Sequence, residues 1–241
     1  MTFQPGLLSD EVAVVTGGTC GIGAAIVAAL GQLGARVIAA GLDAEAFQGV
    51  EGLDVFAREL DVTDEGGVRA LIHDLERLDI LVNCAGIIRR VEEHSLDVFE
   101  KVLAVNLTGT MRMCSAARAK LKQSGGCIVN TASMLSFFGG GLAPGYSASK
   151  GGVMQLTKSL ALAYASDGIR VNAVAPGWIA TSLTKVLQDD SARSDAILAR
   201  TPLGRWGTPS DVANAVTFLC SPAAAFMTGV ILPVDGGYLI A

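Results

Sequence analysis

The pentapeptide YSASK, residues 146–150, places a phenol and an ammonium group four positions apart. Positions i and i+4 share one face of an α-helix, so Tyr146 and Lys150 could act together on one bound molecule. The chemistry open to such a pair is proton transfer, because a tyrosine, which titrates at about pH 10 on its own, becomes a better base beside a cation. The same residues also fit the first turn of a helix without any chemical role. The pentapeptide alone leaves both interpretations open.

A glycine-rich stretch, TGGTCGIG at residues 16–23, follows the apolar run VAVVT and leads into the helical pattern AAIVAALGQLG. Glycine lets the chain turn sharply and lets a phosphate approach the backbone, while the following helix offers free N-terminal N–H groups. The spacing is G-x-x-x-G-x-G and not the commoner G-x-G-x-x-G, so the interpretation depends on the position between a strand and a helix. We expect a nucleotide-binding turn formed by Gly17, Thr19, Cys20, Gly21, Ile22 and Gly23.

The residues after the second apolar run, RVIAA at 36–40, bear on the choice of cofactor. An acidic side chain there accepts from a ribose 2′-hydroxyl, whereas a basic one meets a 2′-phosphate. Leu42 and Asp43 stand at this position, and Cys20 occupies a place in the glycine turn where a basic residue could serve NADP. We therefore expect NAD, with NADP left open because Asp43 could instead cap the next turn.

Polar residues follow further strands of the expected sheet. Asp61 could meet the adenine amino group, and Ser133 stands at the carboxyl end of the fifth strand, where ligands bind in such folds. Asn106 lies in a predicted apolar helix, where a lone amide usually has a structural role. The expected cofactor contacts of these strand ends come from Asp61, Val62, Asn83, Ala85 and Gly86.

Short apolar runs alternate with longer helical patterns along the whole chain, which predicts a parallel sheet covered on both faces. We expect an α/β fold with one Rossmann-type, doubly wound parallel sheet of about seven strands, in a single domain over residues 1–241. A polar, helix-like insertion at 181–205 could form a small lid over a substrate. The predicted strands include VAVVT, RVIAA, DILVN, GCIVNT, RVNAVA and VILPVD.

The composition excludes several other classes. Hydrophobic residues make up 51% of the 241 positions, but the best candidate for a membrane span, the uncharged stretch 12–35, is broken by six glycines, which argues against one. The net charge of −5 without a basic tract argues against a nucleic-acid partner. Five widely spaced cysteines without a C-x-x-C pair, and two isolated histidines, predict neither disulfides nor a metal site. The first basic residue is Arg36, so no secretory signal is expected and the cytoplasm is the default compartment.

The motifs taken together resemble the classical short-chain dehydrogenase/reductase family over nearly the whole chain. The motifs in order are TGGTCGIG, DV at Asp61, NCAG, Asn106, Ser133, YSASK, PGWIAT and DGG, and the one departure is Cys84, where the family often has a second asparagine. The resemblance implies an NAD(P)-dependent oxidoreductase that moves a hydride between the nicotinamide and a secondary alcohol or ketone. It implies Tyr146 as general acid/base, Ser133 as partner of the substrate oxygen, Lys150 as holder of the cofactor, and Asn106 as organiser of a water relay.

The resemblance also implies surroundings for the nicotinamide and the substrate. Four residues of PGWIAT, namely Pro176, Gly177, Ile179 and Thr181, are expected around the nicotinamide, although the motif could merely end a strand. The stretches GIIRR and SMLSFFGGG border the substrate side and are most similar to members that act on keto-deoxy sugar acids. A carboxylate substrate would suit Arg89 or Arg90, although adjacent arginines are usually surface residues. The expected substrate contacts are Arg90, Ser133 and Tyr146.

The helix predicted at 147–165 carries apolar residues on more than one face, so one face needs a partner other than the sheet. Equivalent helices pair subunits in the resembling family, which implies a homotetramer that acts on a small molecule. An alternative function remains, a catalytically silent nucleotide-binding sensor or scaffold on the same fold.

Overall fold

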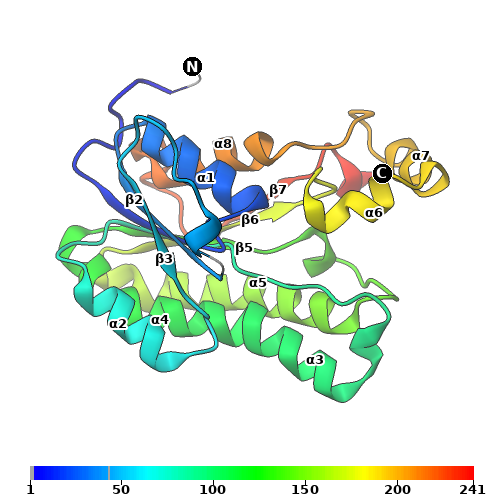
Figure 1. Ribbon diagram of the computed structural model, residues 1–241, viewed down its shortest axis with the longest axis horizontal. Helices are drawn as coiled ribbons and strands as arrows, with labels where there is room; N and C mark the ends of the chain where they lie inside the picture. Colours follow the sequence, from blue (N-terminus) through cyan, green and yellow to red (C-terminus); the bar gives the residue numbers. More distant parts are fainter. Residues whose placement is uncertain (1–2, 43) are drawn as a thin grey trace.

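A computed structural model describes residues 3–42 and 44–241 and places their strands in one parallel sheet of order β3-β2-β1-β4-β5-β6-β7 (Figure 1). The order runs in opposite directions from β1 and β4, so the crevice at their carboxyl ends is the place where such sheets bind ligands. The fold prediction is confirmed. The strands are β1 Val12–Thr16, β2 Arg36–Gly41, β3 Val55–Glu59, β4 Ile80–Asn83, β5 Cys127–Thr131, β6 Arg170–Pro176 and β7 Ile231–Val234.

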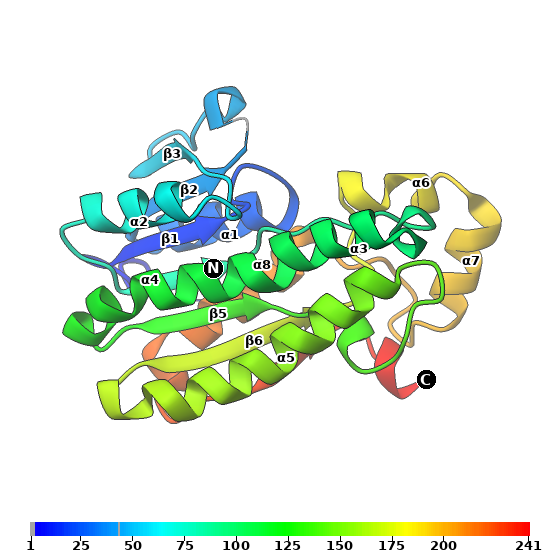
Figure 2. The ribbon, with the colours of Figure 1, turned by 90° about the horizontal axis from the view of Figure 1, so that it is seen from below.

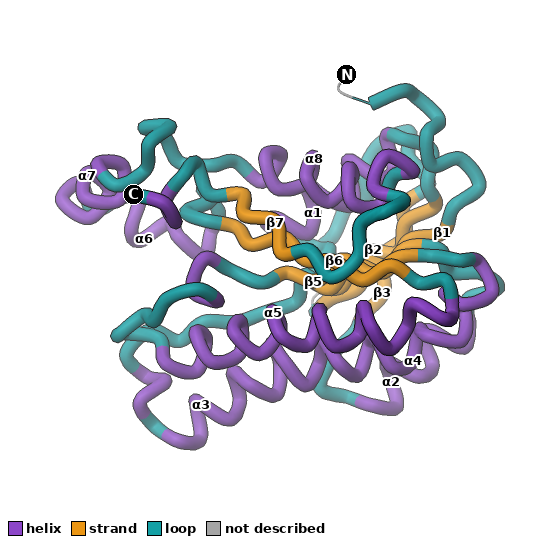
Figure 3. Tube along the Cα trace, turned by 180° about the vertical axis from the view of Figure 1, so that it is seen from behind, coloured by secondary structure: helices purple, strands orange, loops and turns teal. Residues whose placement is uncertain are grey.

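Helices cover both faces of this sheet, and Figures 1 and 3 show the three layers from opposite sides. Two helices, α1 (Gly21–Gln32) and α8 (Pro209–Cys220), lie on one face. The other face is covered by α2 (Glu65–Asp74), α4 (Gly109–Ser124) and α5 (Pro144–Tyr164), with α3 (Leu96–Leu103) beyond the strand ends. The short helical segments are η1 Ala44–Ala46, η2 Glu92–His94, η3 Ala104–Thr108, η4 Met134–Ser136, η5 Ala165–Asp167, η6 Ser182–Thr184, η7 Pro222–Ala224 and η8 Tyr238–Ile240.

Burial on both faces explains why the central strands are continuously apolar in sequence. Val14 and Val15 are neighbours in β1, yet Val14 packs in the core under α2 and α4, and Val15 packs in the core under α1 and α8. Strand β3 has no continuous apolar run because its exposed positions include charged residues, as expected at an edge of the sheet.

The predicted uncharged stretch 12–35 divides into β1 and α1, joined by the glycine turn. Among the described helices, none is both long and apolar enough to cross a membrane.

The predicted insertion at 181–205 contains η6 and two further short helices, α6 (Lys185–Gln188) and α7 (Ser191–Ala199). They stand beyond the carboxyl ends of the strands, on the right of Figure 2 near the C-terminal segment. Segments α3, η3 and α4 follow one another without a break. Segment η3 is a π-helical turn, a feature that often occurs at functional sites.

Strand β7 ends the sheet beside β6 and contains Pro233. Proline has no N–H to donate to a ladder, which fits its place on an edge strand.

Candidate active site

The glycine turn between β1 and α1 is packed too tightly for side chains. Gly17 has φ +64°, and a Cβ there would lie 2.9 Å from the backbone of Ala85. A Cβ on Gly23 would lie 2.0 Å from the carbonyl oxygen of Gly17. These glycines bring the turn against the loop after β4, where the hydroxyl of Thr16 also accepts from the backbone N–H groups of Cys84 and Ala85 at 3.2 Å.

The same turn fits the pyrophosphate of a dinucleotide. Cys20 precedes α1 in an extended conformation and gives the helix no side-chain cap, and the first turn of α1 has no acidic residue. The N–H groups and the positive dipole end of α1 therefore meet no side-chain anion of the turn itself, which suits a phosphate group.

The region after β2 is partly described. Leu42 is exposed, and Thr19 lies directly against Gly41, whose Cβ would stand 2.9 Å from the Thr19 hydroxyl. Asp43, predicted to bind the adenosine ribose, lies outside the described residues. A carboxylate that the sequence prediction missed is Glu59 at the end of β3, whose Oε2 accepts from the backbone N–H of Ala44 at 2.9 Å. Glu59 could have been found only from its pairing with Gly41 across β2 and β3, and that pairing cannot be predicted unless β3 is recognised as a strand.

The predicted adenine contact, Asp61, forms a tight turn. Its Oδ1 accepts from the backbone N–H of Thr63 at 2.8 Å and from the Thr63 hydroxyl at 2.7 Å. These hydrogen bonds hold the pKa of Asp61 below its usual range, so the carboxylate is ionised at neutral pH. Val62 beside it is buried, in contact with the helix that begins at Gly109.

The end of β4 and the loop after it hold three of the predicted cofactor contacts. The side-chain amide of Asn83 is buried and donates to Asn130 Oδ1 at 2.9 Å and to Cys114 Sγ at 3.3 Å, so Asn83 supports the loop from inside. Ala85 lies against the glycine turn, while a Cβ on Gly86 would lie 3.3 Å from Asn106 Oδ1 and 3.6 Å from Lys150 Nζ. Residues far apart in sequence thus meet at this loop.

Asn106 holds the same loop from the π-helical segment η3. It is fully buried, its Oδ1 accepts from the backbone N–H of Ile87 at 2.8 Å, and its amide donates to Ile87 O at 2.9 Å. The amide also donates to the hydroxyl of Ser149 at 3.0 Å. Asn106 therefore joins the loop after β4 to helix α5, which is the structural role of its side chain in this arrangement.

Tyr146, Ser133 and Lys150 lie together at the carboxyl end of β5. Helix α5 carries Tyr146 and Lys150 on one face, with Lys150 Nζ 5.6 Å from the centre of the Tyr146 ring. Lys150 is buried and donates to the carbonyl oxygen of Thr131 at 2.6 Å. Ser133 caps η4 by accepting from the backbone N–H of Leu135 at 3.2 Å.

Burial perturbs both titrating groups of α5. It raises the pKa of Tyr146, while a hydrogen bond with the Ser133 hydroxyl and the positive charge of Arg90 oppose that rise. Burial lowers the pKa of Lys150 to about 8. Opposite shifts of an acid and a base at one strand end are typical of sites that move protons.

Tyr146 and Ser133 line one cavity of about 100 Å³, whereas the buried Lys150 is not part of its lining. Ile22 of the glycine turn lines it on one side, and Leu183 and Thr184 of the 181–205 insertion line it on another. Arg90 lines the cavity and is half-buried, whereas Arg89 is exposed. The predicted residues that share this cavity are Ile22, Arg90, Ser133, Tyr146, Pro176, Gly177, Ile179 and Thr181.

The PGWIAT segment closes the space between the glycine turn and the insertion. The Thr181 methyl group lies 3.8 Å from the position of a Cβ on Gly21. The backbone N–H of Thr181 donates to the hydroxyl of Thr184 at 3.1 Å, and the buried Ile179 carbonyl accepts from that hydroxyl at 2.6 Å. The segment is thereby tied to the first residues of the insertion.

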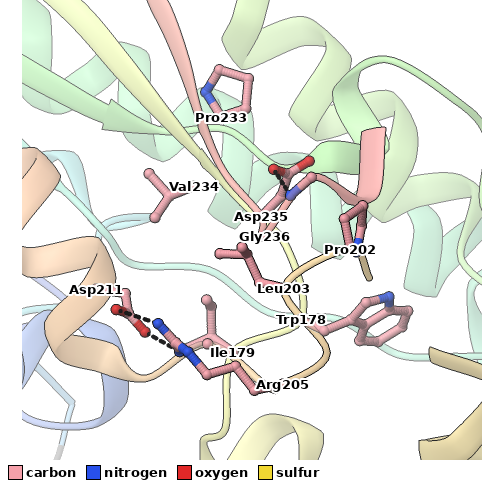
Figure 4. A pocket seen from close by; sticks show the side chains of 12 residues that line it. Trp178, Ile179, Pro202, Leu203, Arg205, Asp211, Pro233, Val234, Asp235 and Gly236 are labelled. Atoms are coloured by element: carbon pink, nitrogen blue, oxygen red, sulfur yellow. Dashed lines mark hydrogen bonds and ion pairs between the residues drawn. The ribbon is translucent and has the colours of Figure 1, made fainter. Parts of the chain in front are cut away.

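A larger cavity of about 420 Å³ lies on the other side of Trp178 and Ile179 (Figure 4). The charged side chains that line it are engaged by other protein groups. Arg205 pairs with both oxygens of Asp211, at 2.8 and 3.0 Å. The Asp235 carboxylate accepts from the backbone N–H groups of Gly237 and Leu239. Trp178 also contacts Trp206 and Tyr238 edge to face, with ring centres 6.0 and 6.2 Å apart. No sequence spacing predicted this aromatic contact, because its members come from separate loops.

Comparisons with known proteins agree with this geometry. A family model described as enoyl-(acyl carrier protein) reductase matches residues 7–239. The 2-dehydro-3-deoxy-D-gluconate 5-dehydrogenase of Pseudoalteromonas atlantica is 40% identical, over 96% of this chain and 97% of its own. Galactitol 2-dehydrogenase (L-tagatose-forming) of Cereibacter sphaeroides is 41% identical, over 97% and 96%.

Among solved structures, a gluconate 5-dehydrogenase from Burkholderia cenocepacia in complex with NADP and tartrate superposes with a TM-score of 0.91. It is 34% identical, and the match covers 97% of both chains. These likenesses confirm the resemblance predicted from the motifs, including the similarity to sugar-acid enzymes. The chain belongs to the short-chain dehydrogenase/reductase family, and it is an oxidoreductase that transfers a hydride between a nicotinamide cofactor and a secondary alcohol or ketone.

Proposed function

We propose that this protein is an NAD-preferring dehydrogenase that oxidises a secondary hydroxyl of a sugar acid, with Tyr146 as general acid/base. The observation that carries the proposal is the cavity in which Tyr146, Ser133 and Arg90 meet beside the glycine turn. The relatives named above act on sugar acids and on a polyol, which supports this substrate class. Their activities also favour an enzyme over a catalytically silent sensor or scaffold.

The residues of the site divide the work as follows. The bound nicotinamide supplies the hydride acceptor in oxidation and the hydride donor in reduction. Tyr146 takes the alcohol proton at its phenol oxygen in oxidation and returns it in reduction. Ser133 holds the substrate oxygen by a hydrogen bond, and Lys150 contributes positive charge near Tyr146 and holds the cofactor. Asn106 fixes the loop and helix on either side of this group.

Arg90 is the proposed partner of a substrate carboxylate. Within residues 3–42 and 44–241 it has no ion-pair partner, and it lines the same cavity as Tyr146. A guanidinium can bind a carboxylate with two parallel hydrogen bonds, which orients the substrate as well as holding it. A polyol, the alternative substrate, offers no such group.

The preference for NAD rests on charge near the end of β2. No basic residue follows β2 directly, Leu42 is exposed there, and Glu59 adds a negative charge beside Ala44. These features disfavour a 2′-phosphate, although the solved gluconate 5-dehydrogenase named above holds NADP.

Further proposals concern the organisation of the protein. Residues 1–241 form one domain, and the insertion at 181–205 acts as a lid, because Leu183 and Thr184 line the cavity. The protein works in the cytoplasm as a homotetramer, assembled through faces that include α5, on which Leu162 is 84% exposed. Light scattering that gave a monomer at micromolar concentration would contradict this assembly.

The proposed function is tested by following nicotinamide absorbance with D-gluconate, 2-dehydro-3-deoxy-D-gluconate and galactitol, each with both cofactors. Sugar acids with NAD should be turned over best, and Tyr146→Phe should lower kcat by about 10²- to 10⁴-fold, the range for loss of a general acid/base. Tyr164→Phe is the matched control, because it removes a phenol hydroxyl from the far end of the same helix. Equal activity of Tyr146→Phe and wild type would show that the proposed mechanism is wrong.

A further inference from the structure

Glu93 is a buried carboxylate that the proposed reaction does not use. It is 1% exposed, lies in η2, and follows three residues after Arg90. In the part of the chain that the structure describes, its carboxylate has no ion-pair partner. Its oxygens are occupied by backbone groups instead: Oε1 accepts from the N–H of Arg89 at 2.7 Å, and Oε2 accepts from the N–H of Tyr146 at 2.8 Å.

The second of these hydrogen bonds caps helix α5. Ala143 precedes the helix without a side-chain cap, and Pro144 has no N–H. The N–H of Tyr146 is one of the helix-terminal donors that have no partner inside a helix, and Glu93 satisfies it from 53 positions earlier in the chain. The negative charge also lies at the positive dipole end of α5, where an anion is stabilised. A carboxylate of another segment thus fixes the turn that presents Tyr146.

The turn that carries Glu93 is itself fastened to the residues before α5. The backbone N–H of Val91 donates to the carbonyl oxygen of Leu142 at 2.7 Å, and the His94 ring makes a 3.0 Å hydrogen bond with the carbonyl oxygen of Gly141. Val91 has φ +70°, a conformation that β-branched residues rarely adopt. This unfavourable conformation is held in place between Arg90 and Glu93, and such strain is concentrated at functional sites.

We propose that Glu93 is a positioning residue for the reaction: its two carboxylate oxygens hold the turn that carries Arg90 and the first turn of α5, which carries Tyr146, at a fixed separation. The inference rests on the proposed function. A carboxylate is needed because both bonded groups are N–H donors, so both oxygens must accept. A glutamine of the same shape would turn its NH₂ group toward one of these donors and lose that hydrogen bond.

The proposal predicts different effects on binding and on turnover. Glu93→Gln should raise KM for a sugar acid, because Arg90 moves, and should lower kcat, because Tyr146 moves, so that kcat/KM falls by about 10- to 100-fold. With a polyol, which has no carboxylate for Arg90, the loss should lie mainly in kcat. A change that only weakened folding would not separate the two substrates in this way.

A pH profile gives a second readout. The titratable or charged groups around Tyr146 are Arg90 and Glu93 from the 90–93 turn, Cys84 from the loop after β4, and Lys150 from α5. The negative charge of Glu93 raises the pKa of Tyr146. In oxidation kcat rises with pH as Tyr146 loses its proton, so Glu93→Gln should move this rising limb of the profile to lower pH. Glu93→Asp keeps the charge but shortens the reach, so it should lower kcat and leave the limb in place.

The control is Glu92→Gln, an exposed neighbour in the same short helix, which should match wild type. If Glu93→Gln folds and keeps both constants within twofold of wild type, with the limb unmoved, Glu93 is not a positioning residue. If Glu93→Gln does not fold, Glu93→Asp decides by the same kcat comparison. If Tyr146→Phe is inactive while the Glu93 variants behave as wild type, only this inference fails; if Tyr146→Phe is fully active, the proposed function itself fails.

Discussion

The ammonium group of Lys150 donates a 2.6 Å hydrogen bond to the carbonyl oxygen of Thr131, with the lysine side chain almost completely buried. This contact joins α5 to the end of β5, while the helix itself places Lys150 one turn after Tyr146. Because the buried ammonium loses its hydration, burial lowers the pKa of Lys150 to about 8. The buried ammonium should therefore make the free energy of unfolding depend on pH.

The first prediction concerns stability of the cofactor-free protein and pH. The pKa of Lys150 is about 8 in the folded protein, against 10.5 for an unperturbed lysine. Between these values the unfolded chain binds a proton at Lys150 that the folded protein does not, so the contribution of Lys150 to stability rises with pH across this window. We therefore expect the difference in free energy of unfolding between wild type and Lys150→Met to shift in favour of wild type by about 3 kcal/mol across this window, at about 1.4 kcal/mol per pKa unit. Urea unfolding at pH 7.5 and pH 10.5 measures the gain, and a difference that does not change with pH would contradict the prediction.

The second prediction concerns the glycine turn. Gly23→Ala places a methyl group 2.0 Å from the Gly17 carbonyl oxygen, where only backbone could move aside. We expect the turn to be displaced and the Kd for NADH to rise at least about tenfold, the effect of losing about 1.4 kcal/mol. Gly139→Ala is the control, because a Cβ there meets nothing within 4 Å. Fluorescence titration measures both variants, and equal affinity for NADH would refute the role of the turn.

The third prediction concerns Arg90. Hydrogen bonds to charged groups contribute about 1.5–3 kcal/mol, so Arg90→Met should lower kcat/KM for a sugar acid by about 10- to 100-fold. Activity on a polyol should change much less, and the pH limb of oxidation should move to higher pH, because Arg90 lowers the pKa of Tyr146. Arg89→Met removes the same charge from the exposed neighbour and should leave the steady-state constants unchanged. An equal loss in both variants would argue against a carboxylate site.

The fourth prediction concerns cofactor choice. Glu59→Gln keeps an oxygen for the N–H of Ala44 but removes a negative charge near the end of β2. Two exposed charges about 4 Å apart interact by about 1 kcal/mol in water, so the ratio of kcat/KM for NADP to that for NAD should rise about fivefold. Glu51→Gln, an exposed change away from β3, serves as the control. An unchanged ratio would place Glu59 too far from the 2′-position to act.

Much of the site could be predicted because in a parallel sheet the carboxyl ends of the strands meet at one edge. That rule alone placed the glycine turn, Ser133 and the loop after β4 near one another. The spacing of Tyr146 and Lys150 then needed only a helix, and α5 provides it. The rule does not account for Asn106. Its side chain links a loop to a helix from a π-helical turn, and no apolar pattern in the sequence predicts such a turn.

Contacts between loops could not be predicted. Glu93 and Tyr146 are 53 positions apart, and their hydrogen bond depends on the left-handed conformation of Val91, for which the sequence gives no glycine as a signal. Glu59 could not be placed without strand β3, and the charged residues of β3 make it hard to recognise as a strand from the sequence. Likewise, the sequence does not distinguish the adjacent Arg89 and Arg90, whereas in the structure Arg90 lines the cavity and Arg89 is exposed.

Strand β7, the edge strand that contains Pro233, bears on how copies of this chain can associate. An exposed strand edge is a template for pairing with another strand, which leads to open-ended aggregation. Proline removes a donor from such a ladder, so a second β7 cannot pair with this edge through an uninterrupted row of backbone hydrogen bonds. Association along this edge must therefore depend on contacts between side chains, because a continuous backbone ladder is interrupted at Pro233.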